Sequence, residues 1–553
     1  MDMMRENSWD HSIGSKIAAV AVISLTYVLK FLLYRHLTEL DACLSVWQSV
    51  CSIVVNIGAA LAVGALTIMP RRRWIGFTIM LLLDIWLLFN TIYFLANGLL
   101  PDWQVLTLVS QLWGFERALL SYFDWRLILF PLLSIAGVLF LYALNPINDK
   151  PMLRIAAVAL LCGITLQLCG VAANKAPDTD DTDTWSLRSE ELWFMKSHSA
   201  VGHAFYALKN ALTEGLLRFR AVVPLTDHER EIMSSVLGKH NVATEPRGHL
   251  VFILVESLET WAIDATDVHG LPVCPNITQY ISRTPVLYCP AITTQQQYGR
   301  SGDGQLITQT GLLPLMHGVA CMQNGDNVYP NFAHFYADAV VVNGYSNVWN
   351  QHVTTYSYGY KRLIEPRRLH SGSDKRVLEQ LRQQLENADT ATCVLALTID
   401  THAPFKYGND RLQLADEYSA TEKAYLRSVS RFDSLLGEFI AWADTAQNMN
   451  NATIVITADH NHFPQRDGKG LCPLIIKSPE ITENIRVDKA WQMDIFPTVL
   501  YAIGQHNYCW HGFGINLITK SQSSIRITPS QALTISDKLI RTDYFKNSDI
   551  AHR

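Results

Sequence analysis

The sequence predicts two structurally different parts: an N-terminal five-helix transmembrane domain and a C-terminal α/β domain built on a central, mostly parallel sheet. Hydrophobic residues make up 49% of the 553 residues and charged residues only 17%, a small charged share for a soluble protein. Apolar residues dominate up to about residue 175. Beyond that point, short apolar runs alternate with amphipathic helical patterns, which is typical of an α/β sheet protein.

Five apolar segments of the N-terminal part approach or exceed the length of about 20 residues that a helix needs to cross a bilayer. They are Ile17–Tyr34, Val46–Met69, Trp74–Leu95, Leu127–Leu144 and Ile155–Ala173. Arginines are enriched in the cytoplasmic loops of membrane proteins, and Arg71–Arg73 lie between the second and third segments. This loop is therefore placed in the cytoplasm. An odd number of spans then puts the C-terminal domain on the extracytoplasmic, or periplasmic, side of the cytoplasmic (inner) membrane.

Composition sets the expected domain boundaries. Residues 1–174 form the expected membrane domain, with an interfacial helix near 102–126, where aromatic and polar residues mix; an ordinary loop fits that segment equally well. Residues 175–247 are expected to form an acidic linker and a helical connector, and residues 248–553 the α/β domain. Asp84, in the middle of the third span, has no evident partner in the sequence and is assigned a role in helix packing.

Three apolar runs rich in β-branched residues predict buried parallel strands. They are Leu250–Val255, Cys393–Ile399 and Ala452–Thr457. Glu256 follows the first run, His402 the second, and Asp459 and His460 the third. Because active sites of such sheets lie at the carboxyl ends of the strands, Glu256, Asp459 and His460 are expected to meet at one edge. Taken singly, each residue is more often a cap or turn residue, but together two carboxylates and an imidazole suit Zn²⁺ or Mn²⁺.

A glycine-rich turn lies between the first two of these runs. Gln295–Pro314 reads QQQYGRSGDGQLITQTGLLP, and Ser301 stands just before the expected start of a short helix. Helix N-termini bind phosphate, and a serine placed there and activated by a metal ion could attack phosphorus. Gly299, Gly302 and Gly304 would let backbone N–H groups approach the phosphate closely. A serine between glycines is, taken alone, more often an ordinary turn residue.

With these residues assembled, the sequence resembles the lipoteichoic acid synthase and phosphoglycerol transferase branch of the alkaline phosphatase–sulfatase superfamily. The matching segments are VESLE at Val255–Glu259, GRSGDGQ at Gly299–Gln305, NVWNQ at Asn347–Gln351, THAPF at Thr401–Phe405, TADHN at Thr457–Asn461 and MDIFPTVL at Met493–Leu500. They cover about residues 248–515, and the five-span anchor extends the resemblance to nearly the whole chain.

The resemblance implies an alkaline-phosphatase-like (sulfatase) fold and one divalent metal ion, Mn²⁺ or Zn²⁺ with Mg²⁺ as a third candidate. Glu256, Ser301, Asp459 and His460 match the residues that hold this ion. Ser301 would also be the nucleophile, at a position where the family commonly has threonine.

The resemblance also assigns two substrate-binding residues, Trp349 and His402. His402 would in addition donate a proton to the leaving group; the alternative is a hydrogen-bonding residue at a strand end. Gln351 departs from the family, which often has an arginine there. The loop around Asn343–Gly344 lacks the histidine and acid seen in lipoteichoic acid synthases.

The implied function is a membrane-anchored, metal-dependent transferase. It would move phosphoglycerol from a phospholipid donor to a glycan or glycolipid acceptor through a covalent Ser301 intermediate. Phosphoethanolamine transfer by the same fold is the alternative. A sulfatase or phosphodiesterase ranks lower, because Ser301–Gly304 lacks the proline and arginine that follow the modified residue of sulfatases. A catalytically inactive domain that binds glycan or senses lipid is a further alternative. The net charge of −5 argues against a nucleic-acid partner.

Overall fold

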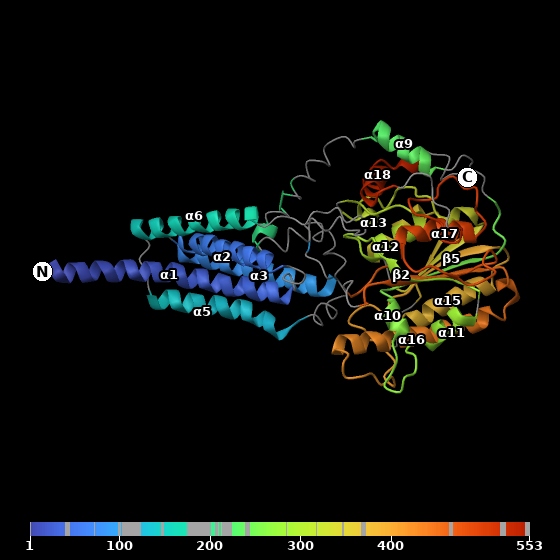
Figure 1. Ribbon diagram of the computed structural model, residues 1–553, viewed down its shortest axis with the longest axis horizontal. Coiled ribbons are helices and arrows are strands. Elements are labelled where there is room, and N and C mark those ends of the chain that lie inside the picture. The colour runs from blue at the N-terminus through green and yellow to red at the C-terminus, as the bar shows by residue number, and fades with distance from the viewer. Residues whose placement is uncertain are drawn as a thin grey trace. The chain divides into compact units, whose positions relative to one another are not determined.

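The computed structural model forms two compact units, Met1–Phe219 and Arg220–Arg553 (Figure 1). The structure describes residues 2–38, 45–70, 72–97, 101, 123–144, 149–173, 199, 201–204, 208–209, 212, 224–237, 244–283, 285–316, 318–345, 348–366, 372–463, 468–519 and 527–547. Most of the expected interfacial helix near 102–126, most of the acidic linker and Asn347 lie outside these ranges. The boundaries expected at residues 174 and 247 therefore stay predictions.

The first unit contains the predicted membrane helices. They are α1 (Asp2–Leu37), α2 (Val46–Ile68), α3 (Arg73–Asn97), α5 (Leu129–Leu144), which the 3-10 turn η2 (Trp125–Ile128) precedes, and α6 (Lys150–Ala173). Five of the described helical stretches are long and apolar enough to cross a membrane, which confirms the five-helix N-terminal domain. Glycine permits close packing of α2 against α6, since a Cβ on Gly58 of α2 would lie 2.6 Å from the carbonyl oxygen of Gly163 on α6.

Asp84 of α3 has partners that the sequence did not reveal. The Lys30 ammonium of α1 lies 2.5 Å from one carboxylate oxygen of Asp84, and the Ser134 hydroxyl of α5 donates to the other at 2.5 Å. The side chains of Lys30 and Asp84 are 0% and 6% exposed. Because an isolated charge among apolar helices is strongly unfavourable, the two residues are buried as a neutralised pair that joins three helices.

The second unit is built on a mixed nine-stranded sheet of order β4-β3-β5-β1-β6-β7-β2-β8, with β9 paired to β2. The strands are β1 (Leu250–Val255), β2 (Leu287–Thr293), β3 (Asp338–Asn343), β4 (Arg362–Ile364), β5 (Thr392–Leu397), β6 (Thr453–Ala458), β7 (Cys472–Lys477), β8 (Ile485–Arg486) and β9 (Ala490–Trp491). The run from β4 to β6 is parallel, and β7 is antiparallel to both β6 and β2. These strands confirm the predicted α/β domain with a mostly parallel sheet.

Helices cover both faces of this sheet. The described helices of this unit are α9 (Asp227–Val236), α10 (Thr260–Asp264), α11 (Pro275–Arg283), α12 (Ser301–Thr310), α13 (Ala320–Gln323), α14 (Gln351–Ser357), α15 (Asp374–Glu386), α16 (Ala420–Ala443), α17 (Ile495–Ala502) and α18 (Pro529–Arg541). Short 3-10 turns are η3 (Phe332–Phe335), η4 (Val348–Asn350), η5 (Gln447–Met449), η6 (Gln492–Asp494) and η7 (Tyr544–Asn547). Figure 1 shows α12, α13 and α17 on one face and α11, α15 and α16 on the other.

The central strand β1 positions the functional residues. Every residue of Leu250–Val255 is buried, because β1 lies between β5 and β6 and helices cover both faces. β-branched and other large apolar side chains suit a strand that is buried on both sides. In the parallel register, Val255 pairs with Ala458 of β6 and Leu254 with Leu397 of β5. The residues that follow these strands are thereby delivered to one edge of the sheet.

Candidate active site

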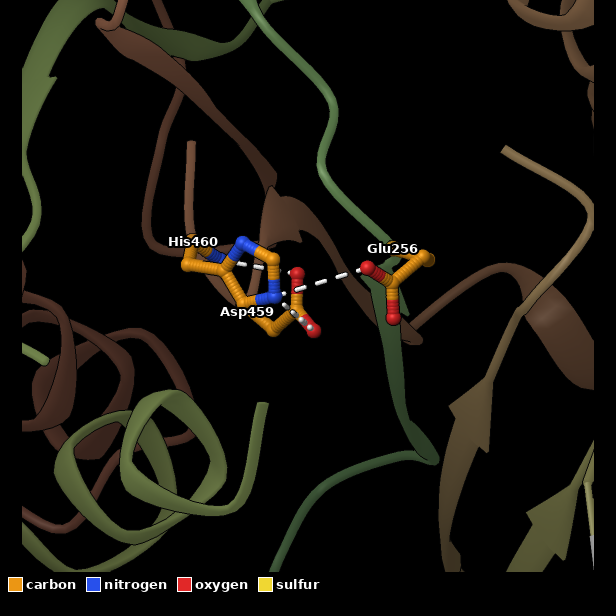
Figure 2. A group of neighbouring side chains, drawn as sticks. All are labelled: Glu256, Asp459 and His460. Atoms are coloured by element: carbon orange, nitrogen blue, oxygen red, sulfur yellow. Dashed lines mark hydrogen bonds and ion pairs between the residues drawn. The ribbon is translucent and has the colours of Figure 1, made fainter. Parts of the chain in front are cut away.

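Three predicted metal ligands meet where β1 and β6 end. Because Val255 and Ala458 are paired, Glu256 and Asp459 leave the sheet side by side, and His460 follows directly. One potential ligand atom from each of Glu256, Asp459 and His460 lies within 4.8 Å of the others. All three residues are buried, each about 4% exposed. Figure 2 shows the imidazole of His460 beside the two carboxylates.

Backbone N–H groups orient the Asp459 carboxylate. Its Oδ1 accepts hydrogen bonds from the backbone of Ser257 at 2.9 Å and of His460 at 2.8 Å. Its Oδ2 lies 3.6 Å from His460 Nε2, toward the centre of the cluster. Ser257 also donates its hydroxyl to Glu256 Oε1 at 2.8 Å. Ser257 was not identified from the sequence, where the only sign of its role is its position beside Glu256 in the VESLE segment.

The two ring nitrogens of His460 have different surroundings. Nε2 lies 3.4 Å from Glu256 Oε1 and 3.1 Å from the Ser301 hydroxyl. Nδ1 lies 2.9 Å from the carbonyl oxygen of Asn461. In the tautomer that carries its proton on Nδ1, the ring donates to this carbonyl and keeps the Nε2 lone pair for a metal ion. That arrangement is usual for histidines that bind metals.

Ser301 completes the group at the first residue of α12. Its hydroxyl lies 3.3 Å from Glu256 Oε2 and 3.1 Å from His460 Nε2. The loop before it is folded around the buried Asp303, whose Oδ2 accepts from the backbone N–H groups of Gln297 and Gly299 at 2.8 Å each. The structure thus brings together the four residues to which the sequence assigned the metal.

The glycine at position 304 has a packing role that the sequence analysis did not foresee. A Cβ there would lie 2.0 Å from the carbonyl oxygen of Asp459. Any side chain at Gly304 would push α12, and Ser301 with it, away from the end of β6. This glycine therefore sets the distance between the serine and the carboxylates.

Trp349 and His402 reach the site from neighbouring loops. Trp349 lies in η4 with a left-handed backbone (φ 55°) and packs against the start of α12, where a Cβ on Gly302 would be 3.4 Å from the Trp349 Cβ. His402 follows β5, and its Nδ1 lies 2.5 Å from the Ala403 carbonyl oxygen. Burial lowers the pKa of His402, and the positive charge of Arg300 lowers it further. Gln351, which stands where relatives often carry arginine, is buried and donates to Thr355 within α14.

The electrostatics of the ligand group favour a cation. Burial raises the pKa of Glu256 well above its usual range, and the negative charge of Asp459 raises it further. Burial also raises the pKa of Asp459 and lowers that of His460 well below the ordinary value. Two buried carboxylates of like charge beside a neutral imidazole are unfavourable without a counter-ion. Oxygen and nitrogen donors in this number fit Zn²⁺ or Mn²⁺.

Glu259, a carboxylate that was not identified from the sequence, holds the loop behind His460. Glu259 is fully buried, and its oxygens accept from the backbone of His462 at 2.7 Å, of Phe463 at 2.6 Å and of Gly470 at 2.9 Å. The Trp261 indole donates to it as well, at 2.6 Å. Glu259 therefore ties the segment after β6, which carries the candidate ligands Asp459 and His460, to the segment after β1, which carries Glu256.

Part of the chain matches a known protein family. Residues 317–505 match the family model described as Sulfatase. Lipoteichoic acid synthase of Staphylococcus aureus is 22% identical over 314 residues, which cover 50% of this chain and 48% of that protein. The chain thus spans about half the length of the curated relatives it matches.

Two solved structures are also similar. The lipooligosaccharide phosphoethanolamine transferase A (EptA) of Neisseria meningitidis is 12% identical with a TM-score of 0.52, over 88% of this chain and 95% of that one. The lipoteichoic acid synthase LtaP of Listeria monocytogenes is 14% identical with a TM-score of 0.47, over 58% of this chain and 98% of that one. The EptA match extends over both units and shows the same architecture of apolar helices followed by an α/β domain. Residues 317–505 therefore resemble the sulfatase family, and the curated relative named above is a lipoteichoic acid synthase.

Proposed function

We propose that this protein is a membrane-anchored, metal-dependent transferase that moves a phospho-head-group from a phospholipid donor to a glycan or glycolipid acceptor. Phosphoglycerol is the proposed group. The observation that carries the proposal is the position of Ser301, whose hydroxyl lies within 3.3 Å of both Glu256 and His460 at the start of α12. A hydroxyl is a weak nucleophile near neutral pH and needs a base or a metal ion to react. The side chains within its reach, Glu256 and His460, could act as a base or hold a metal ion.

Glu256, Ser301, Asp459 and His460 would hold one divalent ion, Mn²⁺ or Zn²⁺, with Mg²⁺ as a third candidate. A bound divalent ion would lower the pKa of the serine hydroxyl and offset negative charge on the phosphoryl oxygens. Asp459 is held by two backbone N–H groups and His460 by one carbonyl oxygen. The ligands are therefore fixed before substrate arrives, as efficient catalysis requires.

In the proposed reaction, the Ser301 hydroxyl loses its proton to solvent and a bond forms between Ser301 Oγ and phosphorus, while the bond from phosphorus to the diacylglycerol oxygen breaks. The leaving oxygen takes a proton and diacylglycerol departs. An acceptor hydroxyl then loses its proton and attacks phosphorus, and Ser301 Oγ takes up a proton as its bond to phosphorus breaks. Trp349 is proposed to contact the head group and His402 to supply the proton to the leaving oxygen. Because burial lowers the pKa of His402, its protonated form is scarce at neutral pH, and this step is expected to quicken as pH falls.

Phosphoethanolamine is the alternative head group. The likeness to EptA concerns the fold and covers both units, so it does not choose between the two head groups. A sulfatase ranks below both because the segment after Ser301 lacks the residues that sulfatases need for their modified nucleophile.

The catalytic domain is proposed to lie on the extracytoplasmic side of the cytoplasmic membrane. The basic residues near the starts of α3 and α6 support this orientation, because such residues are enriched in cytoplasmic loops. A reporter that is active only after export, fused at Lys175, should be active. Activity of a cytoplasmic reporter at the same position would overturn the orientation.

Diacylglycerol release by the full chain in detergent tests the proposed reaction. Phosphatidylglycerol and phosphatidylethanolamine are offered separately, so the preferred donor also identifies the head group. Ser301→Ala should release no diacylglycerol, whereas Ser301→Thr should keep part of the activity because threonine offers the same oxygen. Wild-type release by Ser301→Ala would refute the role of the serine.

A further inference from the structure

Arg300 has an unusual backbone conformation immediately before the proposed nucleophile. It is the N-cap of α12, with φ 42° and ψ −114°. Positive φ values are unfavourable for residues other than glycine, and such strain persists mainly where the surrounding structure or function requires that side chain. A glycine would adopt this conformation freely. Arginine at this position therefore suggests that its guanidinium is needed.

The guanidinium of Arg300 is directed toward the ligand group. One of its nitrogens lies 3.5 Å from the carbonyl oxygen of Asn461, the residue that follows His460. Burial raises the pKa of Glu256 and lowers the pKa of His460; the positive charge of Arg300 opposes the first shift and adds to the second. It also acts on His402, which follows a different strand. The positive charge of Arg300 thus acts on Glu256, His460 and His402, which follow three different strands.

We infer that Arg300 binds a non-bridging oxygen of the donor phosphodiester and holds the phosphorus against Ser301 Oγ. This inference rests on the proposed function and adds the residue that would hold the donor phosphate. A guanidinium suits the role because it stays charged at all relevant pH values and its planar donors match phosphate oxygens. Because Arg300 directly precedes Ser301, the guanidinium and the serine hydroxyl lie on one short segment of the chain.

The charges of the site favour a phosphodiester over a phosphomonoester. The carboxylates of Glu256 and Asp459 balance a divalent ion, and Arg300 then leaves one positive charge. A phosphodiester carries a single negative charge, which the positive charge of Arg300 would balance. A monoester dianion would leave one negative charge uncompensated in a largely buried site, which is unfavourable. Gln351 adds no charge, because its neutral amide is buried and bonded to Thr355.

A purely structural role predicts different behaviour. If Arg300 only fastened the Asn461 carbonyl, its loss would disturb His460 and hence metal binding. Phosphate binding and diester cleavage would then fall only together with metal content. Arg300→Gly is useful here, since it removes the side chain and also relieves the strained backbone. Misfolding is therefore least expected for this variant.

The experiment uses the full chain in detergent, loaded with Mn²⁺ or Zn²⁺, and compares wild type with Arg300→Gln, Arg300→Lys and Arg300→Gly. Arg376→Gln is the matched control, because Arg376 is exposed and pairs only with Glu379 in the contacts described for α15. The probes are bis(4-nitrophenyl) phosphate as diester, 4-nitrophenyl phosphate as monoester and inorganic phosphate as competitive inhibitor. Metal content and thermal unfolding are measured on the same samples.

Wild type should cleave the diester faster than the monoester. Arg300→Gln and Arg300→Gly should lose about 100-fold in kcat/KM on the diester, the usual effect of removing one phosphate-stabilising donor. Arg300→Lys should lose less, about tenfold, because it keeps the charge but not the planar fork. The inhibition constant of inorganic phosphate should rise in parallel, with metal content unchanged.

Three results would contradict the inference. Diester cleavage and phosphate inhibition within about twofold of wild type in Arg300→Gln and Arg300→Gly would show that the guanidinium does not bind the phosphate. Loss of metal from these variants in proportion to activity would show a role in positioning His460. A wild type that neither cleaves the diester nor releases diacylglycerol would overturn the proposed function itself, and this inference with it.

Discussion

Both units of the protein bury ionised side chains, but they do so in opposite ways. In the membrane unit, Lys30 and Asp84 have opposite charges and lie 2.5 Å apart. In the α/β unit, Glu256 and Asp459 have the same charge, and each raises the energy of the other's ionised form. Because Lys30 and Asp84 neutralise each other, the pair needs no further ion and can serve helix packing alone. Two buried carboxylates need either a bound proton or a cation, and the His460 imidazole beside Glu256 and Asp459 makes a metal ion the proposed counter-ion here.

The largest effect is expected at the incomplete site. Replacing Asp459 or His460 by alanine removes a proposed metal ligand whose geometry two strands and several hydrogen bonds maintain. Bound metal and turnover should both be abolished, with a loss of at least about 1,000-fold in kcat/KM. Metal analysis and diester cleavage by the full chain measure this. Normal metal content together with normal turnover in either variant would rule out the proposed ligand set.

Substitutions in the Lys30–Asp84 pair should change the stability of the membrane unit, whereas substitutions at the metal site change activity. Lys30→Met leaves the Asp84 carboxylate buried without its cation and should destabilise the unit by about 3–5 kcal/mol. The double variant Lys30→Met/Asp84→Leu removes both charges and should recover most of that loss. Thermal unfolding in detergent compares the three proteins. Equal instability of the single and double variants would mean that the charges are not coupled.

Glu259→Gln tests whether the loop behind His460 is held by a carboxylate. An amide supplies one acceptor oxygen in place of two, so at least one of the four hydrogen bonds to Glu259 is lost. Metal affinity should fall about 10- to 100-fold, the usual effect of removing a residue that orients a metal ligand. Titration with a metal-sensitive dye measures the affinity. Glu379→Gln, on the exposed face of α15, is the control and should bind metal as wild type does.

A second pair of buried acids extends the comparison and predicts a pH dependence. Burial and the charge of Asp400 raise the pKa of Asp374 from 3.8 to about 8. Asp374 Oδ1 accepts from the backbone of Ile399 and Asp400, while Oδ2 has no hydrogen-bond partner among the described residues. The folded state therefore binds a proton more tightly than the unfolded state. The resulting stability is complete below pH 3.8 and is lost as pH rises toward 8.

Asp374→Asn should remove this dependence. The slope that Asp374 contributes to the free energy of unfolding is at most about 1.4 kcal/mol per pH unit. Asparagine keeps the acceptor oxygen without the charge, so the variant should exceed wild type in unfolding temperature at pH 9 and differ less at pH 5. An unchanged difference between pH 5 and pH 9 would show that Asp374 does not titrate in this range.

The sequence was sufficient for features that follow from chain order. Leu250–Val255 is a fully apolar run, and a buried parallel strand has one end at which functional residues gather, so Glu256 could be placed beside Asp459 and His460. Ser301 was found because glycines and a short apolar helix surround it. The five apolar segments likewise fixed the architecture of the membrane unit.

Other features depend on contacts between distant parts of the chain and left no pattern. Lys30 and Asp84 are 54 residues apart and lie on helices whose pairing the sequence does not state. Glu259 was visible only as one letter of a matching segment, and its partners belong to a loop about 200 residues later. Gly304 was interpreted as a phosphate-binding glycine, but glycine is needed at this position because the Asp459 carbonyl packs against it.

The most direct test of the account is to locate the covalent intermediate. The metal-loaded full chain is incubated with phosphatidylglycerol that is isotopically labelled in its phosphoglycerol head group, quenched before acceptor is added, digested and mapped by mass spectrometry. The account predicts a labelled head group on Ser301 that disappears when the metal is chelated and when acceptor is supplied. Label on another residue, or diacylglycerol release with no labelled residue at all, would contradict it.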